Sequence, residues 1–298
     1  MSRAHTLRIG SHPMNLSLFI LRQRRHLEAL AEARDWAVHW LGYAEGRDSG
    51  RLLQQDQVDW VGTGSTPPLY SRAAGADLVY VGASASRQTS SALLVLADSP
   101  LQRIDQLRGS RIASTVGSYT DHFLAQALHS HHLDYQAVEV LDLPGREGQH
   151  ALQAGRVQAW AALDPLLSEQ LQTGQVRALG QAGDFIPNRS LFWANRSWVE
   201  REPQQARLVF QALAENDRWI AGHIEQAAEL LAGSHPQQVA ASTWAASLRQ
   251  RPWGIEPARQ PILDEQDQQA RLLFSAGLLN NALPPSLGRD LSLSTERS

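Results

Sequence analysis

Short turns rich in glycine and hydroxyl-bearing residues offer most of the chemistry in this sequence. Residues 62–68 read GTGSTPP, so Gly64, Ser65 and Thr66 stand directly before a pair of prolines. Proline suits the first position of a helix, glycine allows a close approach to the backbone, and a helix start presents free N–H groups. The turn is therefore suited to holding an oxyanion, although an ordinary capped helix start has the same pattern.

Three further turns follow apolar runs in the same way. Ligands of parallel α/β sheets lie at the carboxyl ends of strands, where such turns enter helices. The turn before Pro165 contains a carboxylate, but no second acid or histidine lies near it in sequence, so it indicates no reaction. The candidate residues in these turns are Ser11, His12 and Met14 (GSHPMN, 10–15), Gly117, Ser118 and Tyr119 (TVGSYTD, 115–121), and Asp164.

Two arginines and one tryptophan complete the set of candidate residues. Arg87 lies in SASRQTSS and Arg189 in PNRS, where each could supply a full positive charge to an anion. A single arginine is more often a surface or ion-pair residue. Trp193 falls near the expected end of a strand, where it would line a cleft or fill a core.

The composition excludes several classes of function. All 27 cationic residues are arginine, and the chain has no cysteine. A P-loop lysine, a pyridoxal Schiff base, a thiolate nucleophile and a cysteine zinc site are therefore impossible. The net charge of -3 argues against a nucleic-acid partner. Residues 129–132 (HSHH) fit a solvated helix end better than a metal site, so we expect no metal and no cofactor.

The elements that position these turns alternate between strand and helix. Apolar runs predict strands at 7–9, 37–41, 58–62, 78–83, 93–96, 111–114, 138–143, 159–163 and 176–179. Helical patterns lie between them, at 16–33, 48–55, 67–74, 119–129, 147–154 and 165–173. This order predicts an α/β architecture with parallel sheets. Residues 197–279 are almost entirely helix-like. Residues 52–60 (LLQQDQVDW) and 151–160 (ALQAGRVQAW) are similar to each other, which favours two related lobes, although chance gives such an echo as readily.

Several stretches of the chain resemble a known family. Residues 52–84, 98–128 and 151–170, together with RPWGIEP and QQARLLFSAGLL near the C-terminus, resemble the substrate-binding proteins of ABC importers for aliphatic sulfonates, within the sulfonate, taurine and nitrate group. The resemblance covers about residues 7–279. It implies a two-lobed periplasmic-binding-protein fold of type II, with two crossover strands and the ligand in the interlobe cleft. Lobe I would comprise residues 1–86 and 191–298, and lobe II residues 87–190.

The resemblance also implies roles for the turns. The anion-binding turns of the family fall on residues 11–14, 64–66 and 117–119, its aspartate falls on Asp164, and its return crossover falls at residues 188–193. The first loop, SHPMN, is bulkier than the family's usual glycine- and serine-bearing form. This departure leaves the shape of the pocket for the alkyl tail open.

The expected function is that of a monomeric, non-enzymatic solute-binding protein. It would capture a small organosulfonate (an alkanesulfonate or taurine) or a sulfate ester and deliver it to an ABC permease. The resemblance implies a periplasmic location, whereas the chain begins without a leader peptide and would be cytoplasmic if complete. Two alternatives therefore remain: a cytoplasmic enzyme of the same fold acting on a sulfur-containing or aromatic acid, and a cytoplasmic ligand sensor. The known enzymes of this fold rely on cysteine, which this chain lacks.

Overall fold

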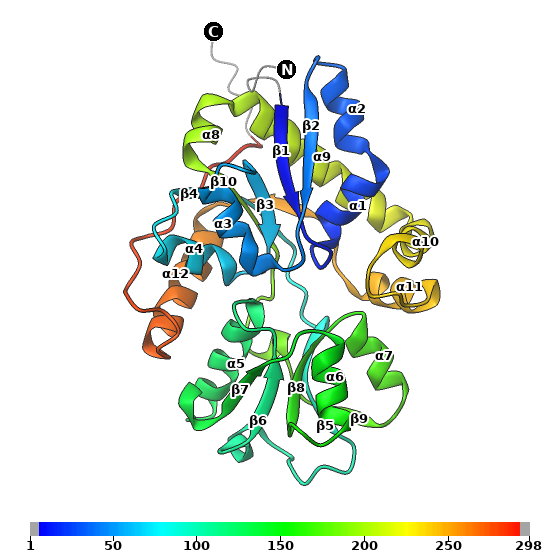
Figure 1. Cartoon of the computed structure of the whole chain (residues 1–298), viewed down its shortest axis with the longest axis vertical. Helices are drawn as coiled ribbons and strands as arrows, with labels where there is room; N and C mark the ends of the chain where they lie inside the picture. The colour runs from blue at the N-terminus through cyan, green and yellow to red at the C-terminus, as the bar shows by residue number, and fades with distance from the viewer. Residues whose placement is uncertain (1–5, 293–298) are drawn as a thin grey trace.

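A six-stranded sheet forms the centre of the upper half of the molecule (Figure 1). In this computed structural model, which describes residues 6–292, β1 (Thr6–Ser11) pairs in parallel with β2 (Ala37–Gly42) and β3 (Trp60–Thr63). The strand β10 (Leu191–Asn195) lies between β3 and β4 (Leu78–Ser84) and is antiparallel to both. The short β11 (Ile255–Pro257) closes the edge beside β4. We call this sheet and the helices on it lobe I.

A five-stranded sheet forms the centre of the lower half, which we call lobe II. Its order is β7 (Glu139–Asp142), β6 (Arg111–Ser114), β8 (Ala159–Leu163), β5 (Ser91–Leu96) and β9 (Val176–Gln181). β6 is parallel to β7 and β8, whereas β5 is antiparallel to β8 and β9. The expectation of purely parallel sheets is therefore wrong. Each sheet is mixed because β5 and β10, the first strands after the two crossings, run opposite to their neighbours, as does β11 beside β4.

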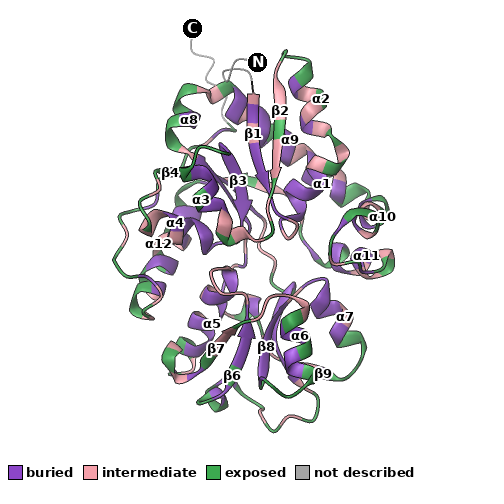
Figure 2. Cartoon of the chain, viewed as in Figure 1, coloured by how far each residue is buried: buried purple, intermediate pink, exposed green. Residues whose placement is uncertain are grey.

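Helices cover both sheets and leave the central strands buried, whereas the edge strands β2, β7 and β9 are partly exposed (Figure 2). Lobe I carries α1 (Leu16–Arg24), α2 (His26–Glu32), α3 (Ser49–Gln54) and α4 (Pro67–Ala73), with the 3-10 turn η2 (Gly46–Asp48). Lobe II carries α5 (Tyr119–Ser130), α6 (Arg146–Gln153) and α7 (Leu166–Gln172), with the 3-10 turns η3 (Ile104–Leu107), η4 (Tyr135–Ala137) and η5 (Ala182–Asp184). The helix expected over 16–33 is two helices, because Arg25 adopts a left-handed conformation with φ 53°.

The last third of the chain joins the two lobes along their sides. It forms α8 (Arg196–Arg201), α9 (Pro203–Gly222), α10 (Ile224–Ser234), α11 (Ala241–Gln250) and α12 (Gln260–Ser275). α9 packs on α1 and α2, whereas α11 contacts α7 and α12 contacts α5 of lobe II. Within the part of the chain that is described, no helix combines the length and apolar character that a membrane crossing needs.

The chain passes between the sheets twice, once after β4 and once before β10 (Figure 1). The two passages run side by side: the Arg87 N–H donates to the Asn188 carbonyl at 3.2 Å, and the Ser84 N–H donates to the Ser190 carbonyl at 2.9 Å. These contacts support a division of the lobes at residues 86–87 and 190–191, which stays a prediction.

Candidate ligand-binding site

A cleft of about 360 Å³ lies between the two lobes and takes its walls from both. Lobe I contributes the turn after β1, the turn after β3 and the 235–237 loop, while lobe II contributes the turns after β6, β7 and β8. Of the residues predicted from sequence, six line this cleft: His12, Met14, Gly64, Arg87, Ser118 and Tyr119.

The turn after β1 places two polar side chains with free hydrogen-bonding atoms at the cleft. Asn15 uses its Oδ1 to cap α1 by accepting from the Leu18 N–H at 3.1 Å, which leaves its buried Nδ2 without a partner. Both ring nitrogens of His12 are also buried without a partner. Burial lowers the pKa of His12 to about 4, so the ring is neutral at physiological pH. Unpartnered polar atoms in a cleft are costly and indicate that a ligand or water completes them.

His235 fixes this turn from the outside, and the sequence patterns gave no signal for it. Its Nδ1 accepts from the Gln237 N–H at 3.2 Å, so its Nε2 carries the proton and donates to the Pro13 carbonyl at 3.2 Å. The ring also lies edge-on to Phe19 and Trp244. Burial lowers its pKa to about 4, so this hydrogen-bonding arrangement persists at neutral pH. The 235–237 loop therefore holds the Pro13 backbone at the cleft wall.

Arg87 is the cation of the cleft. Its Nε donates to the Asn188 carbonyl at 3.2 Å, and among the described residues no carboxylate forms an ion pair with it. Burial, reinforced by the like charge of Arg251, lowers the pKa of Arg87 to about 9, and the guanidinium remains charged at neutral pH. Arg251 lies behind it, 6% exposed and with its Nε unpartnered. An anion bound in front of Arg87 would favour its charged form.

In the turn before α4, one predicted residue lines the cleft and two are buried in the interior of lobe I. Gly64 lines the cleft, whereas Ser65 and Thr66 lie behind the lining. Thr66 Oγ1 accepts from Gln269 Nε2 at 2.8 Å, so it does not cap the helix. Ser65 Oγ is buried without a partner.

Most hydrogen-bond donors of the turn before α5 already have an acceptor within the turn or in neighbouring residues. The N–H groups at 116, 117, 118, 120 and 121 all have acceptors close by in lobe II. Thr120 Oγ1 donates to the Thr115 carbonyl, so it accepts from the Ser118 hydroxyl at 2.8 Å. Ser91 donates to the Ala162 carbonyl, so it accepts from the Tyr119 hydroxyl at 2.6 Å. The donors expected from this turn are therefore largely occupied.

Besides Ser65 and Thr66, five more predicted residues lie away from the cleft lining. Asp164 is fully buried and accepts from the Ser168 and Ser247 hydroxyls at 2.7 and 3.1 Å. Arg189 pairs with Glu256 and Glu265, at 2.7 and 3.0 Å. The other three are Gly117, which faces the Arg47 side chain, Trp193, which donates to Thr63 Oγ1 from the lobe I core, and Ser11, whose buried Oγ has no partner.

The remaining wall of the cleft is mostly apolar. Met14 and Pro67 come from lobe I, while Trp160, Leu163 and Leu166 come from lobe II. Trp160 packs closely against α6, where a Cβ on Gly148 would lie 2.6 Å from Cδ1 and Nε1 of its ring. This surface suits the carbon portion of a ligand.

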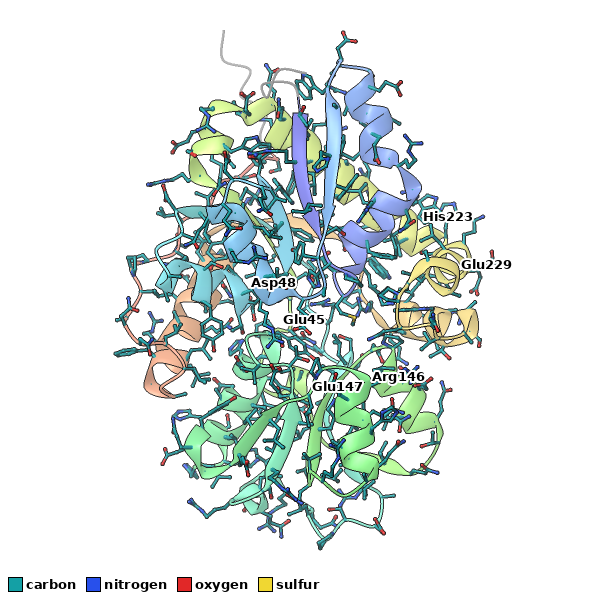
Figure 3. All side chains as sticks on the ribbon, viewed as in Figure 1. Glu45, Asp48, Arg146, Glu147, His223 and Glu229 are labelled. Atoms are coloured by element: carbon teal, nitrogen blue, oxygen red, sulfur yellow. The ribbon has the colours of Figure 1, made fainter. Side chains whose placement is uncertain are left out.

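The carboxylate nearest the cleft is already neutralised. Glu45 lines the cleft, and its Oε2 lies 2.8 Å from the Arg47 guanidinium. Figure 3 shows Glu45 and Asp48 along the lower edge of lobe I, across from Arg146 and Glu147 on the upper edge of lobe II. Arg87 thus remains the uncompensated charge of the lining, and within residues 6–292 no cluster of His, Asp or Glu is arranged for a metal ion.

Comparison with known proteins agrees with this architecture. The profile of the NMT1/THI5-like family matches residues 36–227. The chain is 28% identical, over 279 residues, to the putative aliphatic sulfonates-binding protein of Escherichia coli strain K12, covering 93% of this chain and 86% of that protein. Two solved structures superpose with a TM-score of 0.85 each: the alkanesulfonate-binding protein SsuA from Xanthomonas axonopodis pv. citri bound to MOPS (26% identity, 95% of this chain and 97% of that chain) and the periplasmic aliphatic sulphonate-binding protein SsuA from Escherichia coli (28% identity, 94% and 95%). The expected two-lobed periplasmic-binding-protein fold is confirmed.

Proposed function

Because the chain belongs to the NMT1/THI5-like family, we propose that it is the solute-binding protein of an ABC importer and captures a small organosulfonate or sulfate ester in the interlobe cleft. The observation that carries this proposal is the composition of the cleft. Arg87, which has no ion pair among the described residues, and Asn15, whose Nδ2 has no partner, line a cleft whose remaining wall is mostly apolar.

The two kinds of lining suit the two ends of such a ligand. A sulfonate carries one negative charge on three oxygens, which Arg87 and Asn15 would receive by charge-assisted hydrogen bonds. The carbon tail would lie against Met14, Trp160 and Leu166. An ammonium group on the tail would find only Glu45, which Arg47 already neutralises. Ligands with an uncharged tail should therefore bind more tightly than taurine.

The relatives supply the cellular setting of the proposal. One of them is named as a periplasmic binding protein, and we assign this chain to the same compartment and to the same role beside a membrane permease. We further propose that it works as a monomer, because one chain supplies both walls of the cleft.

Calorimetry with a panel of ligands tests this function. Sodium pentanesulfonate, benzenesulfonate and methyl sulfate should give dissociation constants of about 1 μM or tighter for at least one member, equivalent to about -8 kcal/mol. Taurine should bind more weakly, and glucose and glycine should give no heat. If an amino acid or a sugar binds while every sulfonate and sulfate ester fails, the assignment is wrong.

A further inference from the structure

The turn between β6 and α5, residues 115–121, has two faces. Thr115, Ser118, Tyr119 and Thr120 line the cleft. The opposite face contacts lobe I directly. We propose that Arg47 and Tyr70 of lobe I hold the two lobes closed through their contacts with this turn, and we call these contacts the closure latch. Both are positioning residues that do not touch the ligand.

Arg47 holds the turn from the side of η2. Its Nη1 donates to the Val116 carbonyl at 2.8 Å and to Asp142 Oδ2 at 2.7 Å, so it joins lobe I to two elements of lobe II. Asp142 Oδ1 in turn accepts from the Val116 N–H at 3.1 Å. The side chain of Arg47 packs against Gly117: a Cβ added to Gly117 would lie 3.3 Å from both Cβ and Cδ of Arg47. Neither Arg47 nor Asp142 lines the cleft.

Tyr70 holds the same turn from the side of α4. Its hydroxyl donates to Asp121 Oδ2 at 2.9 Å, and this oxygen also accepts from the Gly117 N–H at 2.8 Å. Asp121 is fully buried. Around this bond, Leu69 of α4, Ala125 of α5 and Leu273 of α12 form one apolar cluster that spans both lobes. A hydrogen bond to a carboxylate in such surroundings is screened little by solvent.

The turn therefore couples two events that could otherwise be independent. A ligand in the cleft contacts one face of the turn, and the side chains of Arg47 and Tyr70 contact the other face. Closure brings both sets of contacts together, so stabilising the closed form raises the apparent affinity for any ligand that binds only that form. The coupling between closure and ligand affinity rests on the proposed function. The latch itself does not depend on the identity of the ligand.

The absence of cysteine allows the latch to be measured directly. A Glu32→Cys, Arg108→Cys pair places one spin label on an exposed position of each lobe. Double electron–electron resonance then reports the interlobe distance with and without sodium pentanesulfonate. Tyr70→Phe and Arg47→Gln should each shift the distribution of the unliganded protein toward longer distances.

Tyr135→Phe is the matched control. Tyr135 is packed against the same apolar cluster, but no hydrogen bond of its hydroxyl joins it to a neighbour among the described residues. This control should leave the distances unchanged, and thermal unfolding should show all three variants folded. The dissociation rate of pentanesulfonate should rise about tenfold in Tyr70→Phe, with the order of preference among sulfonates unchanged. The rate should rise in Arg47→Gln as well, but that variant also removes the ion-pair partner of Glu45 in the lining, so the order of preference is compared in Tyr70→Phe alone.

The outcomes separate the latch from the proposed function. If the wild type binds no sulfonate or sulfate ester of the panel but the unliganded distances still lengthen in both latch variants, the latch stands and the ligand assignment falls. If the distances in the latch variants match those of the wild type and of Tyr135→Phe, the latch is refuted. Unchanged dissociation rates in the latch variants would refute the coupling to ligand release.

Discussion

Gly64 in lobe I lies directly against Tyr119 in lobe II: a Cβ added to Gly64 would lie 2.9 Å from the Tyr119 Cβ and 3.5 Å from its backbone nitrogen. Only a glycine lets the two turns come this close. Gly64→Ala should therefore keep the lobes apart and weaken ligand binding by about tenfold or more, since the clash is with a Cβ that cannot rotate away. Calorimetry on this variant checks the expectation.

Gly233→Ala provides the control for that variant, because it changes a helical glycine that has open space around it. It should bind as the wild type does and unfold at an equal or higher temperature. A Gly64→Ala variant with wild-type affinity would show that the closed arrangement is not the ligand-binding one.

Arg87 and Arg189 should behave oppositely on substitution. Arg87→Gln removes the uncompensated cation of the cleft and should weaken anion binding by about 10- to 100-fold, the range for a charge-assisted hydrogen bond. Arg189→Gln breaks two ion pairs outside the cleft and should lower the unfolding temperature while leaving affinity within about twofold. Titration of both variants with the same sulfonate decides the matter. If Arg189→Gln weakened anion binding more than Arg87→Gln did, the anion site would lie at Arg189.

Asn15 can be tested by changing its donor while keeping its acceptor. Asn15→Asp retains an oxygen for the Leu18 N–H, so the N-terminal cap of α1 survives and a negative charge there suits the helix dipole. The free Nδ2 is replaced by a carboxylate oxygen, which repels an anion. We expect binding to fall by about 100-fold or more without loss of thermal stability. Intact binding would show that the oxyanion lies elsewhere in the cleft.

The pH dependence of stability should reflect two buried aspartates. Burial raises the pKa of Asp121 to about 6 and that of Asp217 to about 6. Tyr70, Tyr135, Asp142 and Arg47 surround Asp121. A carboxyl whose pKa is higher in the folded state stabilises the fold at low pH, and this contribution is lost as pH rises through the folded-state value. The contribution of each aspartate to the free energy of unfolding should therefore fall by about 1 kcal/mol between about pH 5 and pH 7.

Chemical denaturation across that range measures the effect, and Asp121→Asn and Asp217→Asn should each flatten it. His12 and His235 act in the opposite direction in this window: burial lowers their folded-state pKa to about 4, the unfolded chain takes up their protons below about pH 6.5, and their contribution to stability therefore rises with pH. The comparison is therefore between each variant and the wild type: if Asp121→Asn and Asp217→Asn change stability with pH in the same way as the wild type does, the assignment is contradicted.

Local patterns in the sequence predicted most of the elements but not two of the strands. The nine predicted strands correspond to β1–β9, because buried parallel runs and helical periodicity are both local signals. β10 and β11 were not predicted: they are defined by antiparallel pairing with β3 and β4, which lie far away in sequence. The break at Arg25 was missed as well, since nothing in the residue type requires a left-handed backbone there.

For the site, the sequence located turns but not the partners of their side chains. Thr66 is engaged by Gln269 and Asp164 by Ser247, and neither partner is near in sequence. Asn15 could have been found, since an asparagine before an apolar helical run is a recognised cap whose amide group remains free. His235 could not have been, because its importance comes from a carbonyl 222 positions away.

The position of β10 between β3 and β4 sets an order of assembly for the chain. As the polypeptide leaves the ribosome, β1–β4 emerge first, but their sheet lacks a central strand until residue 195 has been made. The five strands of the second sheet are continuous in sequence from Ser91 to Gln181, so they can assemble while that gap is still open. Long-range pairing is slow to form, and an unfilled sheet edge invites aggregation. The lobe that is synthesised first is therefore the one that must wait longest for its core.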